Sequence, residues 1–267
     1  MDLGLQERVA LVTGSYRGTG RAIAEVLAKE GARVWLHGFE ADVTEREAGV
    51  LRDAGLDVHP VVGDIVSESG TDDVARAVTA NGAGVDILVN NYGVAAGPGW
   101  FEGNSEDWIE SYQRNVLSGV RLVQHLVPGM RERGFGRVIF VGTVGSVRPG
   151  NRTPHYYAAK ATLPNLSVGL AKELTGTGIT VNTVSPGILA TAEVKAHFLR
   201  QAEKRGWGDD WDAIEARAVA EFLPNPSARA GRVEEVGALV AFLAGSQAGY
   251  INGANLRIDG GSADVAV

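Results

Sequence analysis

Residues 9–20 read VALVTGSYRGTG, a short apolar β-rich run that passes through a glycine-rich turn into a segment with helical spacing. In such a strand–turn–helix unit, free backbone N–H groups and the positive end of the helix dipole attract an anion. Gly14 permits the tight turn, Gly18 lets the backbone approach a pyrophosphate, and Gly20 lets the helix pack close to the sheet. The stretch therefore predicts a dinucleotide-phosphate site.

A purely structural turn is the alternative for this stretch. The chain has 36 glycines, and the spacing G-x-x-x-G-x-G differs from the commoner dinucleotide pattern G-x-G-x-x-G. The position of the turn, directly after the first predicted strand and before the first predicted helix, favours the phosphate site.

The alternation of strand and helix continues along the chain. Seven apolar runs predict strands at Val9–Thr13, Arg33–His37, Val58–Val62, Ile87–Asn90, Val138–Gly142, Thr180–Val184 and Asn255–Ile258. Six segments with helical spacing lie between them, at Arg21–Lys29, Val43–Ala54, Thr71–Ala80, Ser105–Arg133, Tyr156–Leu174 and Val233–Leu243. This order predicts an α/β fold, a Rossmann-type doubly wound parallel sheet of about seven strands with helices on both faces.

The composition limits the remaining classes of protein. With 267 residues, 45% of them hydrophobic, one domain over residues 1–267 is expected. The net charge of −7 argues against a nucleic-acid partner, which would need a basic surface. The absence of cysteine excludes disulfides and thiolate chemistry and fits a cytoplasmic location. No apolar run is long enough to span a membrane, so we expect no membrane partner. The histidines show no metal-ligand spacing, so no metal site is expected.

Tyr156 and Lys160 lie four residues apart in a predicted helix and therefore share a face. A nearby ammonium stabilises a phenolate, so the lysine can lower the pKa of the tyrosine toward neutral pH. Such a tyrosine can act as a general acid or base. The alternative is a packing tyrosine beside a surface lysine.

These patterns together resemble the short-chain dehydrogenase/reductase family, the shorter single-domain type whose nucleotide loop reads T-G-x-x-x-G-x-G and whose active site carries Y-x-x-x-K. The resemblance covers nearly the whole chain. It includes Asp64 after the third predicted strand, Asn90–Gly93 after the fourth, Asn115 in the long predicted helix and Pro186–Gly187 after the sixth strand. The resemblance implies an oxidoreductase that transfers hydride between a nicotinamide cofactor and a carbonyl or secondary alcohol of a small organic molecule.

The resemblance also implies the site residues. The expected catalytic residues are Tyr156, Lys160, Thr143 and Asn115, with Asn115 helping to hold a water that relays the proton. The expected cofactor-binding residues are Gly14, Ser15, Arg17, Gly18, Thr19, Gly20, Gly38, Phe39, Asp64, Ile65, Asn91, Gly93, Tyr156, Lys160, Pro186, Gly187, Ile188 and Thr191.

Three catalytic positions leave alternatives. The family has a serine thirteen residues before the tyrosine, where this chain has Thr143, and Ser146 is the substitute if threonine does not serve. Tyr157 competes with Tyr156 but does not match the family spacing. His155 is interpreted as structural or as lining the substrate site.

The resemblance favours NADP(H), with NAD(H) as the alternative cofactor. Gly38 occupies the position at which NAD-dependent relatives carry a carboxylate for the ribose hydroxyl. Arg17 stands where NADP-dependent relatives carry a basic residue for the 2′-phosphate. The second arginine of those relatives is Phe39 here, and Glu40 follows. A solvated surface arginine is the alternative for Arg17.

The residues from about 191 to 226 break the strand–helix rhythm and resemble the family's substrate-covering lid. Four aromatic residues, Trp100, Phe101, Trp207 and Trp211, are candidates for an aromatic pocket that would suit a bulky ketone, or else for packing or a subunit contact. The resemblance implies a homotetramer or dimer.

Two other functions remain open. A cofactor-binding protein that has lost catalysis and serves a regulatory or scaffolding role is the first, because Thr143 replaces the family serine. A sugar-nucleotide epimerase or dehydratase is the second, and it fits poorly because the longer relatives space their glycines differently.

Overall fold

The structure is a computed structural model that describes residues 2–80 and 82–265. Its seven strands form one parallel sheet in the order β3-β2-β1-β4-β5-β6-β7. The strands are β1 (Val9–Val12), β2 (Arg33–Gly38), β3 (Val58–Val62), β4 (Ile87–Asn90), β5 (Gly136–Val141), β6 (Ile179–Pro186) and β7 (Asn255–Ile258). The predicted seven-stranded parallel sheet is therefore confirmed. The strand order reverses at β1, whose neighbours are β2 and β4, so loops diverge there and leave a crevice.

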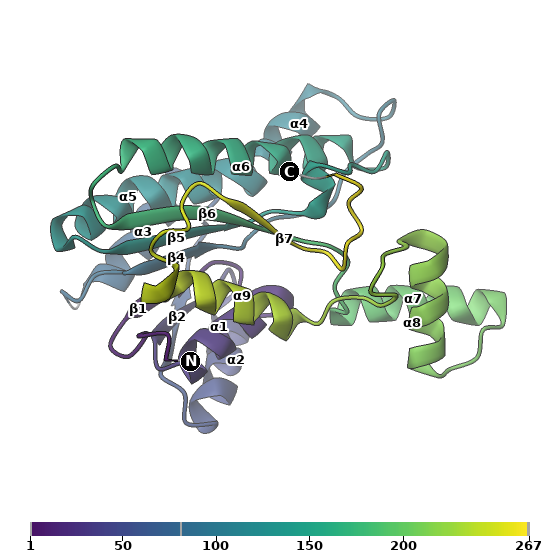
Figure 1. Cartoon of the computed structure of the whole chain (residues 1–267), viewed down its shortest axis with the longest axis horizontal. Helices are drawn as coiled ribbons and strands as arrows, with labels where there is room; N and C mark the ends of the chain where they lie inside the picture. The colour runs from purple at the N-terminus through teal and green to yellow at the C-terminus, as the bar shows by residue number, and fades with distance from the viewer. Residues whose placement is uncertain (1, 81, 266–267) are drawn as a thin grey trace.

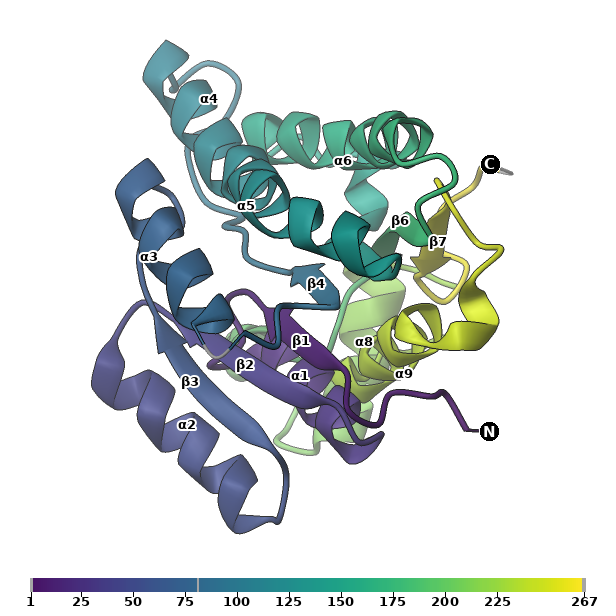
Figure 2. The same cartoon turned by 90° about the vertical axis from the view of Figure 1, so that its left-hand side faces the viewer.

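The central strands are buried along their whole length because both faces of the sheet are covered. All residues of β1, β4, β5 and β6 are buried. Helices α1 (Gly18–Lys29), α2 (Ala41–Asp53) and α9 (Val233–Ala244) pack on one face. Helices α3 (Glu68–Thr79), α5 (Ser118–Arg133) and α6 (Pro154–Glu173) pack on the other. Figures 1 and 2 show these two helical layers on either side of the sheet.

One predicted helix differs from the structure. The segment Ser105–Arg133 is not a single α-helix but α4 (Ser105–Tyr112), a π-helical turn (Gln113–Leu117) and α5. Asn104 caps α4, in a capping box with Asp107. The π turn holds one extra residue per turn, which the periodicity of apolar residues does not reveal, and it contains Asn115.

The 191–226 segment stands apart from the layered body. It forms α7 (Ala192–Arg205) and α8 (Trp211–Phe222), which project beside the sheet (Figure 1). These two helices have a small core of their own, built from Phe198, Ala202, Ile214 and Ala218. A β-bridge between Leu189 and Gly231 joins the chain just before this segment to the chain just after it.

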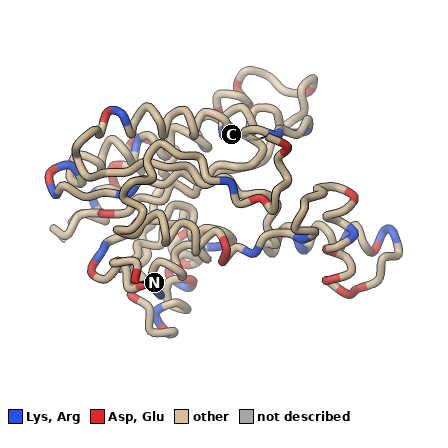
Figure 3. The backbone as a smooth tube through the Cα atoms, in the orientation of Figure 1, with Lys and Arg blue, Asp and Glu red and all other residues tan. Residues whose placement is uncertain are grey.

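Charged residues are mixed over the surface. Figure 3 shows acidic and basic positions alternating along α7 and α8, without a continuous basic stretch. Within the described residues, no helix has the length and apolarity needed to cross a membrane.

Candidate active site

A cleft of about 1050 Å³ opens at the carboxyl ends of the strands. Its wall comes from the loops after β1, β2, β4, β5 and β6, from the start of α6, from the 191–226 segment and from Ser262. Most predicted site residues lie on this wall, namely Gly14, Arg17, Gly18, Thr19, Gly20, Phe39, Asn91, Gly93, Thr143, Tyr156, Lys160, Pro186, Gly187, Ile188 and Thr191. The fold thus brings the glycine-rich turn and the Tyr–Lys pair, more than 130 residues apart in sequence, to one cavity.

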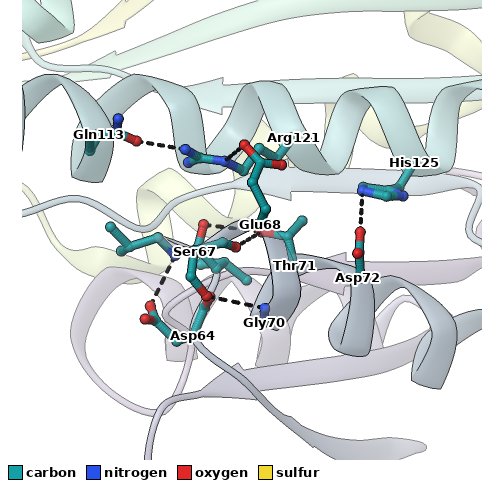
Figure 4. A network of polar contacts seen from close by, with 11 residues as sticks. Asp64, Ser67, Glu68, Gly70, Thr71, Asp72, Gln113, Arg121 and His125 are labelled. Carbon is teal, nitrogen blue, oxygen red and sulfur yellow. Dashed lines mark hydrogen bonds and ion pairs between the residues drawn. The ribbon is translucent and has the colours of Figure 1, made fainter.

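Five predicted site residues lie off the wall: Ser15, Gly38, Asp64, Ile65 and Asn115. Ser15, Ile65 and Asn115 are buried beneath it. Asp64 lies in the turn between β3 and α3, where its carboxylate accepts a hydrogen bond from the Val66 N–H at 3.0 Å. Figure 4 shows Asp64 at the edge of a polar network between α3 and α5.

The phosphate loop, residues 13–20, has the geometry of an anion site. Helix α1 begins at Gly18, and its N-cap residue is Arg17. Within the described part of the chain, the Arg17 side chain makes no capping hydrogen bond to the first N–H groups of the helix. These donors remain available to a ligand at the positive end of the helix. At Gly20 a Cβ atom would lie 2.5 Å from both the Gly14 oxygen and Asn91 Nδ2, so only glycine fits. Asn91 also donates to the Thr13 oxygen at 2.8 Å, which ties the loop after β4 to the phosphate loop.

His37 supports the phosphate loop from below and was missed by sequence reasoning. Its ring Nδ1 accepts the Gly14 N–H at 3.1 Å, and its Nε2 lies 3.0 Å from the Gly63 oxygen. Burial lowers the pKa of His37 to about 4, so the ring is neutral at physiological pH, as an Nδ1 acceptor must be. Its backbone N–H donates to Ser15 Oγ at 2.9 Å, which accounts for the burial of Ser15. A histidine at the end of a strand gives no sequence signal for this role.

Gly38 cannot carry the carboxylate of an NAD-dependent relative with this backbone. A Cβ atom there would lie 2.0 Å from Thr44 Oγ1. The next residue, Phe39, packs between the His37 ring at 5.2 Å and the Tyr92 ring at 4.8 Å. Phe39 and Tyr92 both line the cleft, so an aromatic wall stands where relatives place a second arginine.

Arg17 meets a carboxylate across the mouth of the cleft. Its Nη1 lies 2.5 Å from Oε1 of Glu193, in the first turn of α7. Both side chains are more than half exposed. Arg17, the residue predicted to bind the cofactor 2′-phosphate, therefore also links the phosphate loop to the 191–226 segment.

Tyr156 and Lys160 lie in the first two turns of α6, which begins at Pro154. Lys160 is buried, with 3% of its surface exposed, and its Nζ donates to the Val141 oxygen at 2.9 Å. Burial lowers the pKa of Lys160 to about 8. Burial, with a smaller contribution from Tyr157, raises the pKa of Tyr156 to about 12, while a hydrogen bond with Thr143 acts in the opposite direction.

The predicted lowering of the tyrosine pKa by the lysine is not found in this arrangement. The Lys160 ammonium is hydrogen-bonded to a backbone carbonyl of β5, and desolvation of the phenol dominates. At neutral pH the phenol of Tyr156 is therefore protonated and holds a proton that it can donate.

Thr143 lies directly after β5, where it caps the short 3-10 turn Val144–Ser146. Its Oγ1 accepts the Gly145 N–H at 3.1 Å, and its hydroxyl acts to lower the pKa of Tyr156. Ser146 is not on the wall of the cleft, and its hydroxyl has no hydrogen-bond partner among the described residues. Of these two residues, only Thr143 lines the cleft together with Tyr156.

Asn115 is held by the π turn at the back of the site. It is 4% exposed. Its Oδ1 accepts the Val94 N–H at 2.9 Å, and its Nδ2 donates to the Ser111 oxygen at 2.9 Å. The side-chain amide is thus occupied by protein partners and anchors the loop that follows β4.

The four aromatic residues proposed for a substrate pocket do not line the cleft. Trp207 and Trp211 pack on the small core of α7 and α8, whereas Trp100 and Phe101 are 60% and 98% exposed. The apolar wall beside Tyr156 comes from other residues, including Ile188, Leu189, Val194, Phe222 and Leu223. Tyr157 is on the wall too.

His155 faces the loop after β4. Its ring Nε2 lies 2.8 Å from the Ala96 oxygen, and its ring approaches Trp108 at 6.1 Å. This matches the structural interpretation of His155. Over residues 2–80 and 82–265, no group of three or more His, Cys, Asp or Glu side chains is arranged to hold a metal ion.

Comparison with known proteins gives the family. Residues 14–263 match the family model described as enoyl-(acyl carrier protein) reductase. The chain is 35% identical over 98% of both lengths to an uncharacterized oxidoreductase, YvaG, of Bacillus subtilis. It is 34% identical to the 3-oxoacyl-[acyl-carrier-protein] reductase FabG of Haemophilus influenzae, over 96% of this chain and 98% of that one.

A solved structure is also similar over its whole length. The L-sorbose reductase of Gluconobacter frateurii, complexed with NADPH and L-sorbose, matches all of both chains with a TM-score of 0.93 and 33% identity. The family model, the named reductases and the shared fold agree with the motifs at the cleft. The chain belongs to the short-chain dehydrogenase/reductase family and is an oxidoreductase.

Proposed function

We propose that this enzyme transfers hydride between NADP(H) and the carbonyl or secondary alcohol of a small organic substrate, with Tyr156 as the acid or base. The observation that carries the proposal is that Tyr156, Thr143 and Lys160 share one cleft with the phosphate loop. The uncapped N-terminus of α1 fits a pyrophosphate, and the cleft has the volume for a dinucleotide with a small substrate beside it.

The side chains of the chain itself supply the proton chemistry. A bound nicotinamide supplies or accepts the hydride at the substrate carbon. In the reducing direction, Tyr156 donates its phenol proton to the substrate oxygen, and the Thr143 hydroxyl holds that oxygen by a hydrogen bond. Because burial raises the pKa of Tyr156 to about 12, the donor form is fully populated at neutral pH. Alcohol oxidation would instead need the phenolate of Tyr156 as the base.

Lys160 and Asn115 serve the return of the proton in this proposal. Lys160, whose pKa burial lowers to about 8, is an ammonium at pH 7, and we assign to it the binding of the nicotinamide ribose. Asn115 helps to hold the relay water in this proposal, while its side-chain amide is hydrogen-bonded to Val94 and Ser111. The π turn supports this role, since such turns often occur at functional sites.

NADP(H) is the proposed cofactor. Thr44 leaves no room for a carboxylate at Gly38, and Arg17 is free to exchange Glu193 for a phosphate because both side chains are largely exposed. The similar L-sorbose reductase was solved with NADPH. The test is kcat/KM with NADPH and with NADH for one substrate. A preference for NADH would contradict the assignment.

The substrate end of the cleft is lined by both apolar and polar groups, including Leu189, Phe222, Tyr157 and Arg148. We therefore propose a small ketone that carries polar groups as well as apolar surface. A panel of 3-oxoacyl thioesters, ketoses and simple aryl ketones, followed by loss of NADPH absorbance, tests the class. No turnover across the panel with intact NADPH binding would favour the catalytically inactive alternative, which no observation on the cleft supports.

The remaining assignments are also proposals. The 191–226 segment acts as a lid over the substrate end, because Thr191, Val194 and Phe222 line the cleft while α7 and α8 otherwise stand apart from the sheet. A homotetramer or dimer is proposed because α4 exposes Ile109, at 60%, and Tyr112, at 41%. Light scattering on the purified chain measures the assembly, and a monomer would contradict it.

A further inference from the structure

Two rungs of polar contacts join α3 to α5, and one of them reaches beyond these helices. On the first rung, Arg121 Nε lies 2.6 Å from Glu68 Oε1. On the second rung, one helical turn further along, His125 Nε2 lies 2.9 Å from Asp72 Oδ1. Figure 4 shows the two rungs side by side, and it also shows the guanidinium of Arg121 pointing to Gln113.

The contact between Arg121 and Gln113 spans the π turn. Arg121 Nη2 donates to Gln113 Oε1 at 2.6 Å, although the two residues are eight positions apart. Gln113 is the first residue of the π turn, and Arg121 lies in the first turn of α5. The guanidinium therefore fastens the entry of the π turn to the helix that leaves it and, through Glu68, to α3.

Arg121 is poorly placed to serve stability alone. Only 8% of its surface is exposed, and its Nη1 has no hydrogen-bond partner in the described part of the chain. Its partner Glu68 is 75% exposed, so solvent weakens the attraction that would offset burying the cation. A side chain of this kind is expected where it fixes a geometry that the protein uses.

The geometry that it fixes leads to the catalytic groups. Two residues after Gln113, Asn115 binds the backbone of Val94 through its side-chain oxygen. The neighbouring Gly93 packs against both Asn115 and Lys160, since a Cβ atom on it would lie 2.6 Å from Asn115 Oδ1 and 2.8 Å from Lys160 Nζ. A shift of the π turn would thus move Asn115, the loop after β4 and the surroundings of the Lys160 ammonium together.

We propose that Arg121 is a positioning residue for the reaction, which holds the π turn in the register that aligns Asn115 with Lys160. The inference rests on the proposed function of this site. Arg121 touches neither cofactor nor substrate and acts through Gln113. Its loss should lower turnover and leave cofactor binding nearly unchanged, because the hydrogen bonds that Arg121 makes among the described residues go to Glu68 and Gln113 and not to the phosphate loop.

The test compares two variants of one helix pair. Arg121→Met removes the contacts that reach the π turn, and His125→Gln changes only the contact with Asp72, which does not reach it. For Arg121→Met we expect kcat to fall on the order of tenfold to a hundredfold, with the KM for NADPH nearly unchanged, as misplacement of catalytic groups produces. For His125→Gln we expect kcat and KM close to those of the wild type. Equal losses of kcat in both variants would show a merely structural role and overturn the proposal.

Gln113 provides the second variant and the rescue. Gln113→Leu should reproduce the loss of kcat, and the double variant with Arg121→Met should lose no more than either single one. Gln113→Glu keeps an oxygen acceptor for Arg121 and should retain the wild-type rate. Additive losses, or a wild-type rate in Gln113→Leu, would contradict action through Gln113.

Backbone amide hydrogen exchange tests the effect of Arg121 on the π turn independently of the proposed enzyme activity. Peptides that cover residues 105–117 should exchange faster in Arg121→Met and remain at the wild-type rate in His125→Gln. This readout needs no substrate, so it decides whether Arg121 holds the π turn even if the wild-type protein reduces no ketone in the panel. Unchanged exchange in Arg121→Met would overturn the proposal by itself.

Discussion

The two ends of the cleft are built in different ways. At the cofactor end, buried contacts fix the phosphate loop: His37 holds Gly14 from below, and the backbone leaves no room for a side chain at Gly20. At the substrate end, the wall belongs to helices with a separate small core, linked to the phosphate loop by the exposed pair Arg17–Glu193. A rigid cofactor end and a loosely attached substrate end allow one chemistry to be combined with different substrates.

Replacing Tyr156 with Phe should have the largest effect. It should remove the proton transfer and leave the binding of cofactor unchanged. The variant loses the proton donor and keeps the ring, so kcat is expected to fall by about 100- to 10,000-fold. Fluorescence titration should give a wild-type dissociation constant for NADPH. Full activity would show that another residue is the acid.

Thr143→Ala tests the hydroxyl beside the tyrosine, and Ser146→Ala is its matched control. Loss of a hydrogen bond to the substrate oxygen should lower kcat on the order of 100-fold in Thr143→Ala. Ser146→Ala should have a wild-type kcat because its hydroxyl is off the cleft wall. The reverse pattern would transfer the role to Ser146.

The pH dependence of kcat for ketone reduction should follow the loss of the charge on the buried side chain of Lys160. Lys160 has its pKa lowered to about 8 by burial, so its charge is present below that pH and is lost as the pH rises through it. If the ammonium supports the reaction, kcat should fall about tenfold between pH 7 and pH 9. Tyr156, with a pKa near 12, stays protonated over this range. A flat profile to pH 10 would exclude the role of the lysine charge.

His37→Ala probes the buried support of the cofactor end. Without the ring acceptor, the Gly14 N–H loses its partner, so the Kd for NADPH should rise about tenfold. Activity at saturating NADPH should stay near the wild-type value.

The free energy of unfolding of the wild-type protein should also fall as the pH drops from about 6.5 toward 4, because the unfolded chain takes up a proton that the buried His37 ring resists. A wild-type Kd in the variant would remove His37 from the loop support.

Glu193→Gln should have the smallest effect because its ion pair with Arg17 is exposed. The substitution frees Arg17 for the cofactor phosphate, so the KM for NADPH should fall by a factor of about two to five, within the range of an exposed pair. The KM for NADH, which lacks that phosphate, should not change. An equal shift for both cofactors would mean that the pair acts on the lid and not on the phosphate.

Residues 9–20 and the Tyr156–Lys160 pair could be interpreted from the sequence because their signals are local. A glycine turn after a buried strand and a spacing of four in a helix specify geometry within a few residues. The sheet followed from the same kind of signal, since seven apolar runs alternate with amphipathic segments. The π turn was not predicted, because an extra residue within Ser105–Arg133 leaves the apolar periodicity nearly intact.

The sequence by itself determined the sheet, the phosphate loop and the spacing of the tyrosine and the lysine. Only the tertiary structure joined His37 to Gly14, paired Arg17 with Glu193 and packed Trp207 and Trp211 against the core of a separate helix pair. The physical reason is range. Backbone propensity and hydrophobic periodicity act between neighbours in the chain, whereas hydrogen bonds, ion pairs and burial depend on which distant segments the fold brings into contact.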